Sequence, residues 1–131
     1  MNNPVKTAVI IVNYNGKDFL DRCLDSLRCQ TFSHFQTIVV DNASDDGSAD
    51  GLEERFLNIQ VIRSRQNIGF AAANNLAVQR VEDCKWIALL NPDAFAKPSW
   101  LLNLHHAAKE NPQYSFFGSH MQQYGSSGRL D

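Results

Sequence analysis

The sequence predicts an α/β domain built on a mostly parallel sheet with helices on its faces. Apolar, strand-like runs alternate along the chain with segments of helical period, which is typical of parallel strands joined by crossover helices. Polar residues gather where three of these runs end. The 131 residues are enough for a single hydrophobic core, and no internal repeat or linker divides them. We therefore predict one domain over residues 1–131.

The predicted elements follow the order β-α-β-α-β-α-β-α-β. The first strand, at 7–12, is rich in β-branched residues. The helix after it, at 17–29, places Leu20, Leu24 and Leu27 on one face. The other expected strands are at 36–40, 59–64, 86–90 and 115–118, and the other helices at 48–55, 69–80 and 98–110, with Ser48 and Ser99 as N-caps.

The fourth expected strand, at 86–90, is the strongest single signal. Its five apolar residues do not alternate with polar ones, which predicts a strand buried on both faces. Pro92 cannot continue a strand because it has no N–H group, so Asp93 leaves the sheet at its carboxyl edge. Ligands bind at this edge in open α/β sheets, and a carboxylate there can hold Mg²⁺ or Mn²⁺. A plain Asn-Pro-Asp turn is the alternative.

Composition excludes several classes of protein. A hydrophobic fraction of 44% and a charged fraction of 20% are those of a globular domain. The net charge is −2 and no basic run occurs, so nucleic acid is not an expected partner. Apolar runs fall far short of the roughly 20 residues that span a bilayer, and the first residues lack a leader pattern, which favours a cytoplasmic protein. The three cysteines lack metal-binding spacing and are expected to be reduced thiols.

The polar strand ends predict a shared site. Residues 13–15, 41–46 and 91–93 each follow an expected strand, and the carboxyl ends of parallel strands meet at one edge. The turn after the first strand has one glycine, where a dinucleotide-binding fingerprint needs three. No Gly-Lys-Ser/Thr phosphate loop is present. A bound phosphate would therefore be neutralised by a metal ion.

Four segments in order resemble glycosyltransferase family 2, the nucleotide-diphospho-sugar transferases of the GT-A fold. They are residues 9–15, 38–48, 67–75 and 91–93. The Asn91-Pro92-Asp93 segment lies where the family has its Asp-x-Asp metal motif, with Asn91 in place of the first aspartate. This form is similar to that of rhamnosyl- and galactofuranosyltransferases within the family. The resemblance covers nearly the whole chain.

The resemblance implies roles for individual residues. Asp41 would accept a hydrogen bond from the N–H of a pyrimidine ring, and the backbone near Asn13 and Tyr14 would contact the base and ribose. Asp93 would bind the Mg²⁺ or Mn²⁺ that bridges the two phosphates. Arg65 lies either near the pyrophosphate or on a solvated surface. The other expected nucleotide-sugar-binding residues are Asn15, Asn42, Ser44, Asn67, Gly69, Asn74 and Asn91.

The implied activity is that of an inverting glycosyltransferase of cell-surface polysaccharide synthesis, at the inner face of the membrane or free in the cytoplasm. The donor would be dTDP-rhamnose or a UDP-sugar, and the acceptor a glycan or a lipid-linked glycan. Family members are longer, so the acceptor-binding half and the catalytic base are expected beyond residue 131, and this chain alone is expected to be inactive. A non-catalytic nucleotide-sugar-binding module or regulatory remnant is the alternative. The last strand and the tail at 125–128 could pair with a second copy through an exposed sheet edge.

Overall fold

A computed structural model describes residues 6–123, in which strands and helices alternate as expected. The elements, in chain order, are β1 (Thr7–Asn13), α1 (Leu20–Arg28), β2 (Phe35–Asp41), α2 (Leu52–Arg55), β3 (Ile59–Arg63), α3 (Phe70–Val78), β4 (Trp86–Leu89) and α4 (Trp100–Glu110). The four strands form one sheet of order β3-β2-β1-β4 in which every pair is parallel. The predicted fold class, a parallel sheet flanked by helices, is confirmed.

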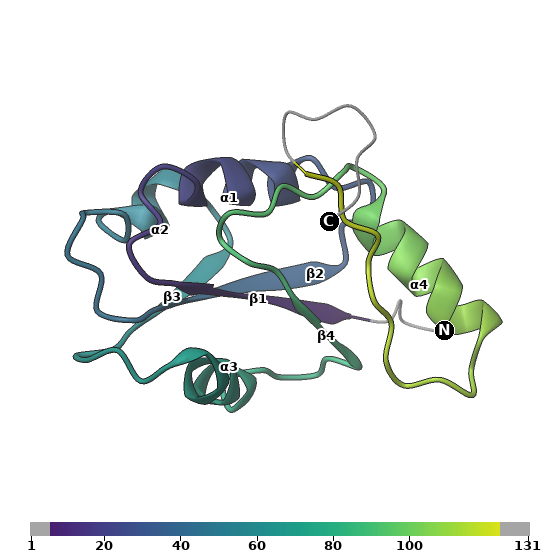
Figure 1. The fold of residues 1–131 in the computed structure, drawn as a ribbon. Coiled ribbons are helices and arrows are strands. Elements are labelled where there is room, and N and C mark those ends of the chain that lie inside the picture. Colours follow the sequence, from purple (N-terminus) through teal and green to yellow (C-terminus); the bar gives the residue numbers. More distant parts are fainter. Residues whose placement is uncertain (1–5, 124–131) are drawn as a thin grey trace.

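The register of the sheet brings the polar strand ends together. Asn13, the last residue of β1, pairs with Asp41, the last residue of β2, and Asp41 pairs in turn with Arg63 at the end of β3. Strand β4 lies on the other side of β1 (Figure 1). The segments that follow β2 and β4 therefore flank the loop after β1.

Each face of the sheet carries its own hydrophobic core. Figure 1 shows α1 and α2 on one face of the sheet and α3 on the other. The α1 face buries Val9, Ile11 and Val39 against Leu24 and Leu101, so α4 also packs on this side. The α3 face forms a smaller cluster of Ile10, Ile38, Val40, Ile62, Ala73 and Ala77. The alanines of α3 bring the helix close to β1 and β2.

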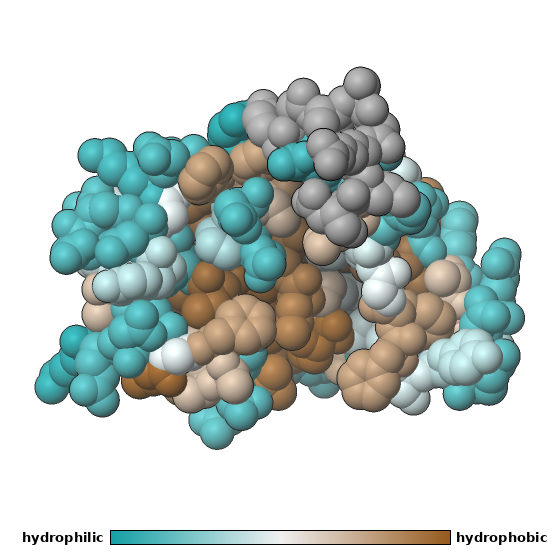
Figure 2. Space-filling view, in the orientation of Figure 1, coloured by the Kyte–Doolittle hydropathy of each residue, from teal (hydrophilic) through white to brown (hydrophobic). Residues whose placement is uncertain are grey.

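Strand β4 differs from its prediction. It lies at an edge of the sheet, and Ile87 and Leu89 are 41% and 52% exposed, so the expected burial on both faces is wrong for this chain. The cause is the position of α3, which packs on β1 and β2 and leaves this face of β4 uncovered. Figure 2 shows hydrophobic atoms gathered in the middle of this side of the molecule. Pairing of this edge with a second copy stays a prediction, and the tail at 125–128 lies outside the described residues.

Two further predictions about elements are wrong. Residues 115–118 do not form a strand, and the aromatic pair there lies in a coil. Ser48 is not an N-cap, because the helix begins at Leu52 after Gly51 and the Ser48 hydroxyl bonds elsewhere. Ser99 is the N-cap residue of α4 as predicted, although its side chain makes no capping hydrogen bond. Within residues 6–123, no helix has both the length and the apolar character needed to cross a membrane.

Candidate functional site

The centre of the site is a buried contact between the ends of β1 and β2. The Asn13 side-chain nitrogen donates hydrogen bonds to Asp41 Oδ1 at 3.0 Å, to Ser48 Oγ at 2.9 Å and to Ser44 Oγ at 3.2 Å. Asn13 is fully buried and Asp41 is 4% exposed. The backbone carbonyl of Asn13 also accepts a hydrogen bond of 2.8 Å from the N–H of Asn42. Asn13 therefore joins the loop after β1 to the loop after β2.

The carboxylate of Asp41 is held by donors from its own turn. Ser44 donates its hydroxyl to Asp41 Oδ1 at 2.7 Å and its backbone N–H to Oδ2 at 3.1 Å. Ala43, between these residues, has a φ of 63°, in the left-handed region that residues other than glycine enter only under local constraint. From residues 6–123, Oδ1 thus accepts two hydrogen bonds and Oδ2 accepts one. A carboxylate offers about four acceptor positions, so Oδ2 retains one.

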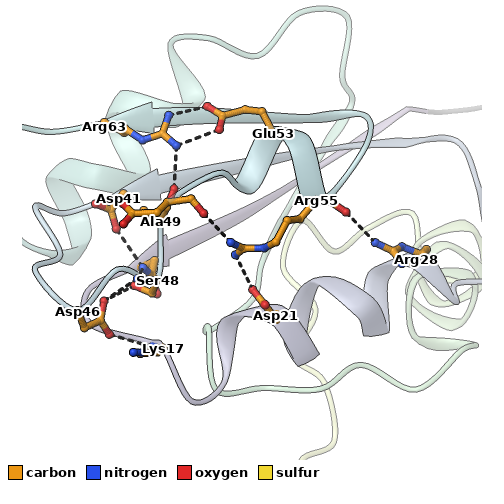
Figure 3. A network of polar contacts seen from close by, with 12 residues as sticks. Lys17, Asp21, Arg28, Asp41, Asp46, Ser48, Ala49, Glu53, Arg55 and Arg63 are labelled. Carbon is orange, nitrogen blue, oxygen red and sulfur yellow. Dashed lines mark hydrogen bonds and ion pairs between the residues drawn. The ribbon is translucent and has the colours of Figure 1, made fainter.

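A second carboxylate extends this network. Asp46 Oδ1 accepts the hydroxyl and the N–H of Ser48 at 2.5 and 2.9 Å, and Oδ2 accepts the N–H of Lys17 at 2.9 Å. These hydrogen bonds, led by that of the Ser48 hydroxyl, lower the pKa of Asp46 below its usual value. Figure 3 shows Asp46 between Lys17 and Ser48, which belong to neighbouring loops. Asp46 belongs to the polar segment expected at the site and Ser48 was expected to cap a helix, and only the fold shows that they support Asn13.

Gly16 is required by the close packing of the loop after β1. A Cβ atom at this position would lie 2.3 Å from Asn13 Oδ1 and 3.5 Å from the Cβ of Pro92. The same geometry places the Asn91-Pro92-Asp93 turn against the loop after β1. Asn13 Oδ1, buried here, makes no hydrogen bond within residues 6–123. On the outer side of the loop, the N–H of Asn15 donates to Ser44 Oγ at 2.9 Å, and Tyr14 is 53% exposed.

The segment after β3 is fixed by Asn42. Its side chain accepts the N–H of Ile68 and donates to the carbonyl of Gly69, both at 3.2 Å. The side chain of Asn67 accepts the N–H of Gly69 at 2.9 Å, and Gly69 has a φ of 85°. These contacts hold the N-terminus of α3 beside the end of β2.

Asn74 and Arg65, two expected or possible binding residues near this segment, take no part in these contacts. Asn74, on α3, is 8% exposed and donates to the Phe70 carbonyl at 3.0 Å, while its Oδ1 makes no hydrogen bond to the described residues. It contacts the α3 turn and is not joined to Asp41 by a hydrogen bond within residues 6–123. Arg65 is exposed, as in the solvated alternative.

The Asn91-Pro92-Asp93 segment forms a turn directly after β4. The N–H of Ala94 donates to the Asn91 carbonyl at 3.0 Å, and the Cys23 thiol lies 3.5 Å from the same carbonyl oxygen. The side chains of Asn91 and Asp93 are exposed. Burial, and secondarily the negative charge of Asp93, raises the pKa of the Cys23 thiol to about 12. Asp93 is therefore close to α1 and faces solvent at the sheet edge.

The Asn91-Pro92-Asp93 turn suits a cation that is bound by the protein and by the phosphates of a ligand together. No group of three or more metal-ligating side chains of His, Cys, Asp or Glu occurs within the described residues, and Asp93 forms no ion pair with any of them. Mg²⁺ is often bound through one or two carboxylates together with substrate phosphates. Asp93 fits that donor set, because its carboxylate is accessible and uncommitted.

Sequence comparison identifies relatives of the chain among glycosyltransferases. The sequence model of "Glycosyl transferase family 2" matches residues 8–130. An uncharacterized glycosyltransferase of Haemophilus influenzae is 27% identical over 125 residues, 93% of this chain and 38% of that protein. The N-acetylglucosaminyl-diphospho-decaprenol L-rhamnosyltransferase of Mycobacterium tuberculosis is 25% identical over 120 residues, 84% of this chain and 39% of that enzyme.

Solved structures share the fold. TarS residues 1–349 from S. aureus, in complex with UDP-GlcNAc, superpose with a TM-score of 0.74 at 26% identity, over 82% of this chain and 32% of that one. Mannosyltransferase PcManGT from Pyrobaculum calidifontis, in complex with GDP-Man and Mn²⁺, gives 0.72 at 23% identity, over 78% and 32%. The chain spans less than half the length of each of these proteins. Its fold is that of the GT-A glycosyltransferases, and the family match over nearly all of its residues shows that the chain belongs to glycosyl transferase family 2.

Proposed function

We propose that the carboxyl edge of the sheet binds a nucleotide-diphospho-sugar donor with the help of a divalent cation. The whole protein would be an inverting glycosyltransferase that transfers the sugar to a glycan or lipid-linked acceptor of a cell-surface polysaccharide. Family membership supports the class of activity, and the complexes of TarS with UDP-GlcNAc and of PcManGT with GDP-Man support the class of donor. The form of the Asn-Pro-Asp turn and the rhamnosyltransferase relative favour dTDP-rhamnose, with UDP-sugars next.

The main support for the proposal is the position and hydrogen bonding of the Asp41 carboxylate. It lies at the end of β2, oriented by Ser44 and Asn13, and its Oδ2 keeps one acceptor position. The N–H of a pyrimidine ring is a matching donor. Because the carboxylate is already desolvated and fixed, binding the base requires little further ordering of this side chain. Tyr14 and Asn15 are exposed in the loop after β1 and would contact the base and ribose.

The diphosphate would lie between the ends of β1 and β4. Asp93 and the Asn91 side chain would hold the Mg²⁺ or Mn²⁺, which supplies neutralisation of the charge that develops on the leaving nucleoside diphosphate. On the other side, the first turn of α3 has no acidic residue and no side-chain cap, so its backbone N–H groups favour an anion. Gly69 is the N-cap residue of this helix, and Asn67 lies in the segment before it. Arg65 would add a positive charge if it turns toward the phosphates.

Transfer to an acceptor is proposed for the whole protein and donor binding for this chain. An inverting transfer needs a base within hydrogen-bond reach of the acceptor hydroxyl. The base is proposed to lie outside residues 1–131, which makes this chain alone inactive. A non-catalytic nucleotide-sugar-binding module would show the same donor binding, and transfer assays on a longer protein separate the two.

Calorimetry tests the proposal directly. The chain is titrated with UDP, dTDP, GDP and ADP, each with and without Mn²⁺. The proposal predicts tighter binding of the two pyrimidine nucleotides and an increase in affinity when Mn²⁺ is present. Equal affinity for all four nucleotides contradicts the role of Asp41, and no effect of Mn²⁺ contradicts the role of Asp93.

A further inference from the structure

Three side chains on one side of α1 and its C-terminal turn contact the backbone on both sides of Asp93. We name Cys23, Ser26 and Gln30 the α1 strip. The Cys23 thiol lies 3.5 Å from the Asn91 carbonyl oxygen, and Ser26 Oγ accepts the N–H of Ala96 at 3.0 Å. These three residues are far from Asp93 in sequence. The helical pattern alone would predict that Ser26 and Gln30 are ordinary polar positions.

Gln30 makes the most complete contact of the strip. Its Oε1 accepts the N–H of Leu101 at 3.1 Å, and its Nε2 donates to the carbonyl of Lys97 at 2.8 Å. Leu101 is in the first turn of α4, where N–H groups have no partner within the helix. Since the side chain of Ser99, the N-cap residue, makes no capping hydrogen bond, Gln30 supplies an acceptor from outside the helix. The neighbouring N–H of Thr31 donates to the Pro98 carbonyl at 2.9 Å.

The strip meets a segment with little regular structure of its own. Residues 90–99 form no helix or strand, so their backbone groups need partners from elsewhere in the chain. The N–H of Leu90 bonds to β1 before the Asp93 turn, and the α1 strip bonds the backbone on both sides of that turn. The exposed Asp93 carboxylate forms no ion pair with residues 6–123 that would fix it directly. Its place is set by the backbone around it.

We propose that Ser26 and Gln30, with Cys23, are positioning residues that hold the Asp93 turn where its carboxylate can bind a cation together with a nucleoside diphosphate. The inference rests on the proposed function and deepens it. Residues that orient a metal ligand without touching the metal commonly change metal affinity by about 10- to 100-fold when replaced. The strip does not contact the side chains of Asp41 or Ser44, whose partners come from β1, from the loop after β1 and from their own turn. Recognition of the base is therefore independent of it.

The test separates metal-dependent from metal-independent binding. Affinity for UDP is measured by calorimetry with and without Mn²⁺ for the parent, Ser26→Ala and Gln30→Ala. Gln36→Ala is the matched control. Gln36, at the start of β2, is also half-buried, but its side chain bonds to Cys84. Two conservative variants refine the assignment. Ser26→Thr keeps the hydroxyl, and Gln30→Glu keeps the acceptor for Leu101 while losing the donor to Lys97.

We expect Ser26→Ala and Gln30→Ala to lose about 10-fold or more of the Mn²⁺-dependent gain in UDP affinity, with unchanged affinity in the absence of Mn²⁺. Ser26→Thr should restore the gain, Gln30→Glu should restore part of it, and Gln36→Ala should match the parent. Amide hydrogen exchange of Ala96 and Leu101 should accelerate in the two alanine variants, which shows the loosened segment without any ligand.

Parent-like Mn²⁺ dependence in both alanine variants overturns the inference while leaving the proposed function intact. So does accelerated exchange without any change in metal dependence. A parent chain that binds UDP equally with and without Mn²⁺ overturns the proposed metal site and the strip's role in it. In that case parent-like exchange at Ala96 and Leu101 in the variants would also show that the strip does not hold the segment.

Discussion

The side chain of Asn13 donates a hydrogen bond of 3.0 Å to the carboxylate of Asp41, and both residues are almost completely inaccessible to solvent. The pair joins the ends of the two central strands at the edge where the donor is proposed to bind. Asn13 is thus a support for Asp41, and its side chain is turned away from solvent. This relationship leads to predictions about stability as well as binding.

Replacing Asn13 with alanine should destabilise the fold. Asn13→Ala removes a buried donor to a charged acceptor and leaves Ser48 Oγ without that donor, which should lower the free energy of unfolding by about 1.5–3 kcal/mol. Urea denaturation followed by circular dichroism measures the change. Asn75→Ala, at an exposed position of α3, is the control and should stay close to the parent. Equal stability of the two variants would show that the Asn13 contact contributes nothing.

Gly16→Ala should be destabilising for a steric reason. The added Cβ would lie 2.3 Å from Asn13 Oδ1, so the loop or the Asn13 side chain must shift, at a cost of about 1–3 kcal/mol. Gly118→Ala is a matched control because a Cβ there would meet no atom within 4 Å. Thermal or urea unfolding of both variants decides the point, and a Gly16→Ala protein as stable as Gly118→Ala would contradict the packing described for this loop.

Asp41→Asn should reduce the preference for pyrimidine nucleotides. The new NH₂ group replaces an acceptor with a donor, so either the ring N–H or a protein donor loses its partner, and UDP binding should weaken by about 1–3 kcal/mol. Affinity for ADP should change less. Competition binding measures both, with Asp45→Asn as the control because Asp45 is exposed in the same turn. A variant that keeps the parent's ratio of UDP to ADP affinity would rule out base recognition by Asp41.

The Cys23 thiol should be unreactive in the folded protein. Its pKa is raised from 9.0 to about 12, so the folded state disfavours the thiolate that reacts with alkylating reagents. At pH 8, iodoacetamide should modify exposed Cys29 and spare Cys23, as mass spectrometry of peptides will show. Modification of Cys23 at the rate of Cys29 would contradict its burial beneath the Asn91 turn.

The same shift makes stability depend on pH in the alkaline range. Because the folded state holds the proton more tightly than the unfolded state, the contribution of Cys23 is complete below pH 9 and declines as the pH rises from about 9 to about 12. Cys23→Ala should therefore lose less stability than the parent over this interval. The difference between the two proteins in urea denaturation at pH 8 and pH 10 measures the effect.

Much of the fold could be predicted from the sequence because strand and helix periods are local signals. The alternation of β-branched runs with amphipathic segments located every strand and helix of residues 6–110 within a few positions. The burial of β4 could not be predicted in this way. An apolar run such as 86–90 has the same composition whether or not a neighbouring element covers it, and here Ile87 and Leu89 are uncovered.

The candidate ligand-binding residues could be predicted from the sequence. The residues that hold them in place could be predicted less well. Asp41 ends a strand and Asn42 and Asp93 follow strands, so topology alone brings them to one edge. Ser48 was expected to cap a helix because its type and place suit an N-cap, but its hydroxyl bonds to Asp46 and accepts from Asn13. Gln30 gave no sequence signal, since the Lys97 and Leu101 backbone atoms that it contacts are about 70 residues away and its other partner is the carbonyl of nearby Ser26.

Mn²⁺-dependent UDP binding by Asp93→Ala isolates the contribution of the proposed metal ligand. Asp93 is exposed in a turn after β4, so its replacement should leave the fold intact, which circular dichroism can verify. Glu82→Ala, exposed at the opposite end of β4, is the control. We predict that calorimetry will show an increase in UDP affinity on adding Mn²⁺ for the parent and for Glu82→Ala, and no increase for Asp93→Ala. An Asp93→Ala protein that binds UDP and Mn²⁺ as the parent does would contradict the account.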